Sequence, residues 1–469
     1  MSRGILPPPP FRTQPTMKFS LIAAAVLATT ASAIPSASID RWAVLVAGSS
    51  GYENYRHQSD VCHALTQLVA NGVPRKNIIT MLADDIASSD ENPFNGSIYN
   101  APTNAGDTLF DVYPGCVDEQ SYTGENVTAA NFLAVITGNS SAATGTVLQS
   151  TENSHVLIAF FDHGAGGLVC FPAGPYLYAD ELGRALATME EQSLYGRLVI
   201  YIEACESGSM FPSLPTNTSV YATTAANAEE SSWGTFCPPD SDIVNGTHTN
   251  TCLGDLYSIN WMGTVDANCT SCVTGDPACC IEPLDEQTAE VTTLTNLSHV
   301  QVYGDVTDLG DDAIGEWESD YASALGNHAA AKRAPPRVAA KGSISSRTAA
   351  RVSAVARLSA SLSQNNATAV LIAKRRLETL DARAARFTDV FDAISHQLFN
   401  STAAAALKAS AFPDPFREWA CYRSALTSIE AALGPLDDAG LTYARLLALA
   451  CTTHDEAIVN TTVRTAARG

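Results

Sequence analysis

The sequence predicts an α/β fold with a mainly parallel sheet, followed by an all-α unit. Two observations lead to this prediction. Apolar runs without polar alternation recur along the first part of the chain, and several end in glycine, as buried parallel strands do. Helical periodicity separates these runs and then dominates the C-terminal part.

Five segments are expected to form the sheet, because each is apolar almost throughout and ends in a loop signal. Their ranges are 41–49, 76–85, 154–164, 196–205 and 219–226. In a parallel sheet, chemically active side chains gather beyond the carboxyl ends of the strands.

The first helix is expected over residues 59–72, with Ser59 or Asp60 as its N-cap and Gly72 as its stop. The pattern dissolves between residues 236 and 280, which are expected to be loop insertions. Further helices are expected at 179–196 and, after a linker over 329–346, at 350–362, 368–398 and 424–434.

A chain of 469 residues is too long for one small core, so two folded units are expected. Residues 17–33 read as a signal peptide, with one lysine, an apolar stretch and a small-x-small cleavage pattern ending at Ala33. No second apolar run is long enough to span a bilayer, so we expect no membrane anchor.

The charge is divided unevenly along the chain. Residues 34–327, the body, carry 6 Lys/Arg and 38 Asp/Glu, a net charge of −32. Residues 328–469, the tail, carry 18 Lys/Arg and 11 Asp/Glu, a net charge of +7. We expect tail and body to attract each other. The basic residues lack aromatic partners, so no nucleic-acid binding is expected.

The cysteines and sequons point to the secretory pathway. The chain has 12 cysteines, which an oxidising compartment allows to pair. Many Asn-x-Ser/Thr sites are candidate glycan acceptors: Asn95, Asn126, Asn139, Asn217, Asn245, Asn268, Asn296, Asn366, Asn400 and Asn460.

A cysteine and a histidine end two of the expected strands. Cys205 stands between Glu203 and Glu206, whose carboxylates disfavour the reactive thiolate. If the strands are neighbours, His163 meets Cys205 and can act as its base. Singly, a buried inert thiol and a turn histidine are the commoner interpretations; with both residues at strand ends, catalysis is about equally open on the pattern alone.

Longer stretches are similar to a known family. "NYRHQ", "FFDHGAGGLVCFP", "YIEACESGSM", "VYATTAAN" and "LGDLYSINWM" lie within residues 42–262. In this order they resemble legumain, the asparaginyl endopeptidase or vacuolar processing enzyme, of the caspase-like clan of cysteine peptidases. The resemblance implies a caspase-like three-layer sandwich with a mainly parallel sheet, followed by an all-α helical prodomain.

The resemblance also implies roles for individual residues. Cys205 is the nucleophile, His163 the base and Asn54 its orienter, while Gly164 and Cys205 donate backbone N–H groups to the oxyanion. Asp162 resembles an aspartate linked in this family to succinimide formation and ligation. The implied specificity pocket comprises Arg56, His57, Glu203, Ser231, Ser232 and Asp255.

The pocket residues suit an asparagine side chain, which has one carbonyl acceptor and one amide donor. Arg56 can donate to the carbonyl, and Glu203 and Asp255 can accept from the amide. Residues 203 and 205 share a strand face, so Glu203 lines the pocket beside the nucleophile. An aspartate at P1 is expected to enter only at acid pH, once it is protonated.

The tail resembles the helical prodomain that covers the legumain cleft. Asn365, Asn366 and Asn327 are the candidate self-cleavage sites, and acid is expected to weaken the attraction between body and tail. The expected domains are 1–33 (extension and signal peptide), 34–327 (peptidase), 328–366 (linker or activation peptide) and 367–469 (prodomain). Expected partners are polypeptides with exposed Asn, the protein's own prodomain and cystatin-type inhibitors; no cofactor and no metal are expected.

With Cys205 reduced, eleven cysteines remain, so at least one more is free. Cys62 is expected to be that free thiol, as a small buried hydrophobe. Cys421 is expected to pair with Cys451, and Cys237 with Cys252. The pairing of Cys269, Cys272, Cys279 and Cys280 stays open, and disulfides are favoured over zinc there.

Three other functions share some of these features. A peptide ligase or cyclase would use the same Cys205 and His163 with an amine in place of water. A glycolipid-anchor transamidase would lack a cleavable basic tail, and a storage or decoy protein would be expected to lose one member of the pair. The expected location is the secretory pathway, ending in a vacuole, in a lysosome or outside the cell.

Overall fold

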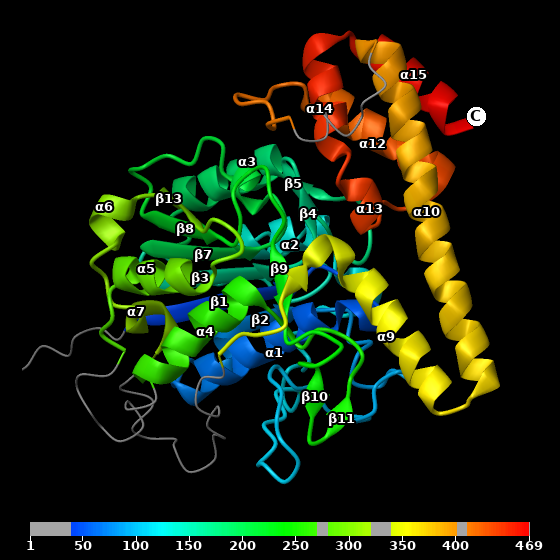
Figure 1. Ribbon diagram of the computed structural model, residues 1–469. Coiled ribbons are helices and arrows are strands. Elements are labelled where there is room, and N and C mark those ends of the chain that lie inside the picture. The colour runs from blue at the N-terminus through cyan, green and yellow to red at the C-terminus, as the bar shows by residue number, and fades with distance from the viewer. Residues whose placement is uncertain (1–38, 270–279, 320–338, 401–409, 469) are drawn as a thin grey trace, which may run out of the picture. The chain divides into compact units, whose positions relative to one another are not determined.

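The predicted parallel strands lie side by side in a six-stranded sheet (Figure 1). The computed structural model describes residues 39–269, 280–319, 339–400 and 410–468. The strand order across the sheet is β13-β8-β7-β3-β1-β2. The strands are β1 (Asp40–Ala47), β2 (Ile78–Met81), β3 (Ser154–Phe161), β7 (Arg197–Glu203), β8 (Val220–Thr224) and β13 (Gln301–Gly304).

Five of these strands are parallel, and only the edge strand β13 runs antiparallel to its neighbour β8. The five parallel strands are the ones that the apolar runs predicted. They are buried on both faces, which explains why their sequences do not alternate between polar and apolar residues. Strand β13 is short and partly exposed, so it carried no such signal.

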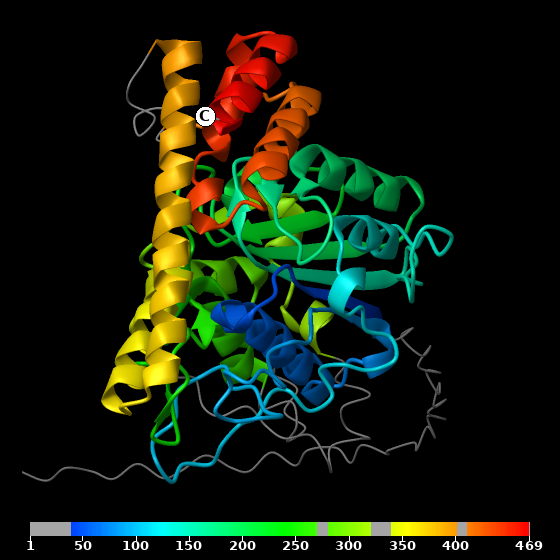
Figure 2. The same ribbon diagram turned by 90° about the vertical axis from the view of Figure 1, so that its right-hand side faces the viewer.

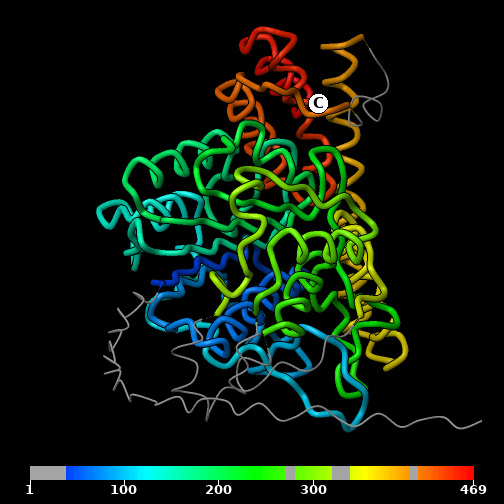
Figure 3. The backbone as a smooth tube through the Cα atoms, turned by 90° about the vertical axis from the view of Figure 1, so that its left-hand side faces the viewer, coloured from blue at the N-terminus to red at the C-terminus, as the bar shows by residue number. Residues whose placement is uncertain are grey.

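Helices cover both faces of the sheet and complete three layers (Figures 1 and 3). One face packs against α1 (Tyr55–Ala70), α4 (Leu256–Cys269) and α5 (Leu284–Leu294) in one apolar cluster. The other face packs against α2 (Ala129–Ile136) and α3 (Ala179–Glu191) in a second cluster. The predicted α/β class and caspase-like three-layer arrangement are confirmed.

Short elements beyond the strand ends form two small sheets and a hairpin. One sheet consists of β4 (Gly164–Ala165), β5 (Leu168–Val169) and β6 (Leu177–Tyr178). The second has the order β12-β9-β14, with β9 (Trp233–Thr235), β12 (Gly254–Asp255) and β14 (Ile344–Ser345). The hairpin pairs β10 (Ile243–Val244) with β11 (Thr247–His248). Two helices of a single turn follow later in the chain, α6 (Val306–Leu309) and α7 (Gly315–Glu318).

Two expectations about helices were wrong. Helix α1 begins at Tyr55, so Ser59 and Asp60 lie inside it and neither is its N-cap. Helix α4 lies within residues 236–280, which were expected to be loops. Nearly all of α4 is buried, and a helix that is buried all round lacks the polar stripe that makes its periodicity visible.

The tail contributes strand β14 and then helices. They are α9 (Ala349–Ser363), α10 (Ala367–Phe399), α12 (Trp419–Leu433), α13 (Asp438–Leu441), α14 (Ala444–Thr453) and α15 (Glu456–Arg468). Helices α9 and α10 form a long hairpin, seen in yellow and orange in Figure 2. The core of the tail includes Phe391 of α10, Tyr422 of α12 and Leu446 of α14, and it continues into Leu168 and Tyr178 of the body.

Four disulfides join cysteines of the described residues: Cys62–Cys116, Cys237–Cys252, Cys269–Cys280 and Cys421–Cys451. The expectation that Cys62 is a free thiol was therefore wrong. Within the described part of the chain, the free thiols are Cys170 and Cys205, both buried.

Several expectations concern residues outside the described ranges. They are the signal peptide, the candidate cleavage site at Asn327, and Cys272 and Cys279. Across the ranges that the structure describes, no helix is long and apolar enough to cross a membrane.

Candidate active site

The sheet register places His163 and Cys205 opposite each other. Strands β3 and β7 pair Phe161 with Glu203, and the Asp162 N–H donates to the Glu203 carbonyl at 2.9 Å. Two residues beyond the ends of these strands, the continued register aligns His163 with Cys205. A Cβ on Gly164 would lie 2.6 Å from the Cys205 carbonyl oxygen, so the close approach of the two chains requires glycine.

Both ring nitrogens of His163 have partners. Its Nε2 lies 2.8 Å from Oδ1 of Asn54, and its Nδ1 lies 2.8 Å from Oδ1 of Asp438 in the tail. Burial of the imidazole lowers its pKa, but the charge of Asp438 outweighs this effect and the net pKa lies above the usual 6.5. The same contact outweighs the burial of Asp438 and holds the pKa of that carboxyl below its usual value.

The thiol of Cys205 is buried beside two serines. Its Sγ lies 3.4 Å from Oγ of Ser231 and 3.7 Å from Oγ of Ser232. The residue after it, Glu206, adopts a left-handed conformation with φ 56°, which turns the chain sharply after the strand.

A buried arginine and two carboxylates meet on the α1 side of the strand ends. The Arg56 side chain is 0% exposed, and its Nε donates to Asp255 Oδ1 at 2.9 Å. Oε2 of Glu203 accepts hydrogen bonds from the backbone and hydroxyl of Ser258. Three buried atoms here have no hydrogen-bond partner: Arg56 Nη2, Glu203 Oε1 and Asp255 Oδ2. One donor and two acceptors are thus left open, which is costly unless a ligand satisfies them.

The carboxyl groups of this pocket hold their protons more strongly than usual. Burial, and then the charge of Asp255, raise the pKa of Glu203 well above 4.5. Burial also raises the pKa of Asp255, although Arg56 lowers it. The neighbouring Asp60 accepts a hydrogen bond from the Asp255 N–H at 3.2 Å, and burial raises its pKa as well. One guanidinium cannot balance three buried carboxylates, so part of the cluster is protonated.

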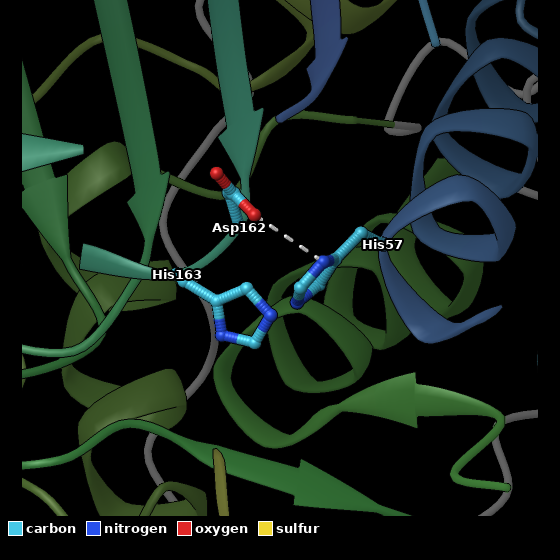
Figure 4. A group of neighbouring side chains, drawn as sticks. All are labelled: His57, Asp162 and His163. Atoms are coloured by element: carbon cyan, nitrogen blue, oxygen red, sulfur yellow. Dashed lines mark ion pairs between the residues drawn. The ribbon is translucent and has the colours of Figure 1, made fainter. Parts of the chain in front are cut away.

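His57 links this pocket to His163. Figure 4 shows its ring facing both the imidazole of His163 and the carboxyl of Asp162. Its Nδ1 lies 2.6 Å from Oγ of Ser49, and its Nε2 lies 3.7 Å from Asp255 Oδ2. Burial keeps the pKa of His57 well below 6.5, with Arg56 and His163 acting in the same direction.

Asp162 is buried, and neither of its carboxyl oxygens has a hydrogen-bond partner. Burial raises its pKa to about 7, although His163 and Arg56 lower it. Within the described ranges, one group of side chains has the spacing of metal ligands. It consists of His57, Asp162 and His163, whose candidate ligand atoms all lie within 4.8 Å of one another. Both imidazoles already contact Ser49, Asn54 or Asp438, which accounts for their positions without an ion.

A segment of the tail contacts the two serines beside Cys205. Strand β14 pairs antiparallel with β9, as an added strand would. Ser345 Oγ lies 2.7 Å from Ser231 Oγ, and Ser346 Oγ lies 3.2 Å from Ser232 Oγ. Nη2 of the next residue, Arg347, donates to the Gly164 carbonyl at 2.6 Å.

Glu206, which sequence analysis left without a role, joins two tail arginines. Its carboxylate lies 3.0 Å from Arg347 and 3.1 Å from Arg445. Burial raises its pKa above 4.5 although both arginines lower it. A cavity of about 730 Å³ is lined by residues of both body and tail, among them Ser49, His163, Cys170, Glu430 and Asp438.

Sequence reasoning did not find Ser49, Arg347, Arg445 or Asp438. Asp438, Arg347 and Arg445 are each more than 140 positions from their partners in the sequence. Ser49 follows a strand as many serines do, so its contact with His57 has no sequence motif. The structure does bring together the residues that were named: Asn54, Arg56, His57, Asp162, His163, Gly164, Glu203, Cys205, Ser231, Ser232 and Asp255.

Fold and site together define a caspase-like α/β protein with a cysteine–histidine pair at the carboxyl ends of its strands. The chain belongs to the Peptidase C13 family, whose model matches residues 41–318. It is 46% identical over 274 residues to a vacuolar-processing enzyme of Vicia sativa, 57% of this chain and 52% of that protein.

Two animal proteins are similarly close. A hemoglobinase of Schistosoma mansoni is 47% identical over 280 residues, 60% of this chain and 59% of that protein. Legumain of Mus musculus is 44% identical over 267 residues, 56% of each chain. The chain thus spans about half the length of the curated relatives that it matches.

Proposed function

We propose that the protein is a cysteine endopeptidase that cleaves peptide bonds after asparagine. The three unpartnered buried atoms of the pocket carry this proposal. Nη2 of Arg56 would donate to the side-chain carbonyl of the substrate asparagine. Oε1 of Glu203 and Oδ2 of Asp255 would accept from its amide. A ligand with this donor and acceptor pattern would satisfy all three atoms at once.

The proposed chemistry uses the pair at the strand ends. His163 takes the proton of the Cys205 thiol, and the sulfur adds to the substrate carbonyl carbon. Backbone N–H groups of Gly164 and Cys205 stabilise the oxyanion. His163 then gives its proton to the departing amine, and water hydrolyses the thioester. Asn54, 2.8 Å from the ring, keeps the imidazole oriented.

The same pocket supports acceptance of aspartate only at acid pH. An ionised aspartate would enter a buried site that already holds Glu203, Asp255 and Asp60 around one guanidinium. Burial and like charge would both raise its pKa. Once protonated, it presents a carbonyl acceptor and a hydroxyl donor, as asparagine presents a carbonyl and an amide.

We also propose that the tail is an intramolecular inhibitor, and that residues 34–327, 328–366 and 367–469 act as peptidase, activation segment and prodomain. Two contacts support this. Strand β14 occupies the groove beside Ser231 and Ser232. Asp438 occupies Nδ1 of His163 while Asn54 occupies Nε2, so no ring nitrogen is left for the thiol.

Opposite charges hold the tail on the body, as expected from the negative net charge of the body and the positive net charge of the tail. Arginines of the tail contact carboxylates of the body at several separate places: Arg357 with Glu91, Arg376 with Glu53 and Glu91, Arg423 with Asp180 and Glu181, and Arg347 and Arg445 with Glu206. Carboxylates lose their charge near pH 4, so acid would weaken this attraction and release the tail.

The Asp438–His163 pair has a different pH dependence. Its contribution to docking requires an ionised Asp438 and a protonated His163. It is lost when pH falls through the lowered pKa of Asp438 and when pH rises through the raised pKa of His163. The pair therefore still holds the tail in mild acid, and release must begin at the other carboxylates.

The test is incubation of the purified precursor at pH 4 to 5, beside a Cys205→Ala variant. Each sample is then assayed on peptides with Asn, Asp, Gln or Lys at P1, with and without an added amine. Processing and Asn-directed hydrolysis, both lost in the variant, are the expected result. Joined products would favour the ligase alternative, in which Asp162 is the candidate residue. Equal cleavage after Lys would contradict the pocket assignment.

The proposed location is a vacuole or lysosome, reached through the secretory pathway. Four disulfides fit an oxidising compartment. Some of the similar proteins are named vacuolar-processing enzymes. Polypeptides with exposed asparagine are the proposed substrates, and cystatin-type proteins are proposed external inhibitors.

A further inference from the structure

A patch of the body beside the active site contacts two arginines of the tail. It consists of Tyr52 and Glu53, just before α1, and of Glu91 in the loop after β2, and we call it the arginine-binding patch. Arg357 of α9 contacts Glu91, and its Cζ lies 5.0 Å from the centre of the Tyr52 ring. Arg376 of α10 lies 2.5 Å from Glu53 and 3.3 Å from Glu91. The two guanidinium groups indicate which ligand chemistry this surface fits.

The Tyr52 side chain is a fixed wall of the arginine-binding patch. It is 3% exposed, and its ring packs edge-on against the Tyr55 ring with 5.5 Å between the ring centres. Its buried hydroxyl has no hydrogen-bond partner. Burial raises the pKa of this hydroxyl, while Arg357 lowers it and Glu91 raises it, so both charges of the patch act on this group. A guanidinium at the ring edge would satisfy the hydroxyl oxygen, which the tail leaves unpartnered.

The arginine-binding patch is continuous with the cleft that holds the reacting imidazole. Glu53 lines the cavity of about 730 Å³ together with Ser49 and His163. The residue after Glu53 is Asn54, whose Oδ1 lies 2.8 Å from Nε2 of His163. A polypeptide bound in the cleft can therefore reach the patch along the surface of the body.

Release of the tail would leave the arginine-binding patch without a cation. Among the residues that the structure describes, the ion pairs of Glu53 and Glu91 are all with tail arginines. The body around them has a net charge of −32. Carboxylates accept the N–H donors of a guanidinium, and the face of an aromatic ring attracts its positive charge. The patch would thus attract an arginine from another polypeptide.

The tail also indicates from which side a substrate would reach this patch. Strand β14 lies in the groove, antiparallel to β9, and the chain then passes Arg347 and enters α9, which brings Arg357 to the patch. From Ala349 to Arg357 the helix rises about 12 Å, which an extended chain covers in about four residues. Three further steps separate Ser346 from Ala349. A substrate strand with the direction of β14 would therefore bring to the patch a residue roughly seven positions beyond the groove.

We propose that, once the tail has left, the arginine-binding patch selects substrates that carry an arginine about five to eight residues after the cleaved asparagine. This inference rests on the proposed function and specifies a class of polypeptide substrate. The substrate guanidinium would contact Glu53 and Glu91 and lie against the Tyr52 ring, as the tail arginines do. Because this contact is remote from the reacting atoms, it should lower KM and change kcat little.

The experiment measures kcat and KM of the acid-activated protein on peptides that contain one asparagine and are otherwise uncharged. One set carries arginine at positions five to eight after the asparagine, one peptide for each position. A second set carries it at the same distances before the asparagine, and a reference peptide has glutamine instead. The first two sets have the same net charge, so general attraction to the acidic body does not separate them.

The expected result is a kcat/KM for the best peptide of the first set that is about 5- to 20-fold above that for its counterpart in the second set. The gain should lie mainly in KM. Lysine in place of arginine should give a smaller gain, because an ammonium group lacks the planar fork of a guanidinium.

Variants assign this gain to the patch. Glu91→Gln should reduce the ratio between the two sets to less than about twofold, because a carboxylate is lost. Tyr52→Phe should reduce it less, because the ring remains. Glu191→Gln is the matched control and should keep the ratio. It removes an exposed carboxylate at the end of α3, which covers the other face of the sheet from α1. The reference peptide and thermal unfolding report whether each variant is intact.

Other outcomes overturn the inference. Equal kcat/KM for the two sets would mean that the acidic body attracts arginine without a particular site. A ratio that survives Glu91→Gln would place the contact elsewhere. In both cases the peptides are still cleaved after asparagine and the proposed function stands. Failure to cleave every peptide, the reference peptide included, would overturn the proposed function and this inference together.

Discussion

The proposed specificity pocket and the docked tail are built from the same groups, arginines and carboxylates, but these groups are arranged differently. In the pocket, Arg56, Glu203 and Asp255 are fully buried and keep unpartnered polar atoms. Along much of the tail, pairs such as Arg376 with Glu53 are partly exposed and satisfied. A buried polar group without a partner costs free energy that a bound ligand can recover. An exposed ion pair contributes little to stability and is easily broken. In the proposed function, the first arrangement recognises a substrate and the second allows an inhibitor to be released.

The largest expected effect concerns the reacting pair. Replacing Cys205 or His163 by alanine should lower kcat/KM on an Asn peptide by on the order of 10⁴-fold or more, because no other group can supply the nucleophile or the base. Circular dichroism and thermal unfolding would show that each variant still folds. Full activity of a folded variant would contradict the assignment.

A smaller effect is expected from the pocket carboxyl. Glu203→Gln should lower kcat/KM on Asn peptides by about 10- to 100-fold, because one acceptor of the pocket is changed. The preference for Asn over Asp at neutral pH should also fall. Glu318→Gln is the matched control, since Glu318 is another buried carboxyl with a pKa raised to about 8, but it lies outside the pocket. Equal losses in both variants would point to stability and not to recognition.

The next effect concerns the contact between tail and imidazole. In a precursor whose candidate cleavage sites carry Asn365→Gln and Asn366→Gln, Asp438→Asn should raise turnover of a small Asn substrate by about 3- to 10-fold. The gain should be greatest in mild acid, where Asp438 is ionised and His163 protonated, and should shrink above the raised pKa of His163. Asp381→Asn, in an exposed pair within the tail, is the control. A gain that does not vary with pH would contradict the ion-pair explanation.

The smallest effects should come from single exposed pairs. Arg376→Ala is expected to speed acid processing only about two- to fivefold, because partly exposed ion pairs contribute little individually. Raising the salt concentration should reproduce this effect in the wild-type protein. Arg351→Ala, which removes a pair within the tail, should not change the rate. A complete loss of docking in Arg376→Ala would mean that one pair dominates.

The parallel sheet and the placement of His163 and Cys205 beyond the ends of neighbouring strands were predictable, because their signals are local. The apolar runs predicted the parallel strands, and Gly164 and Cys205 indicated where two of these strands end. The start of α1 was missed because Arg56, His57 and Asp60 are buried in the pocket, where polar residues break the usual amphipathic pattern.

Long-range pairings were not predictable. The partner of Cys62 is 54 residues away, and spacing alone does not determine a disulfide. Asp438 reaches His163 across most of the chain, and nothing in the composition of α13 indicates it. The charge division did predict that tail and body attract each other, because net charge is a property of whole segments.

The most direct measurement of the central claim compares Asn and Leu at P1. The two side chains have nearly the same shape, but only asparagine can satisfy Arg56, Glu203 and Asp255 together. With tail-free enzyme, the account predicts that kcat/KM for the Asn peptide exceeds that for the Leu peptide by on the order of 10⁴-fold. It also predicts that an Asp peptide approaches the Asn peptide only as pH falls. Comparable cleavage after Leu would show that the unpartnered atoms do not select the substrate and would contradict the account.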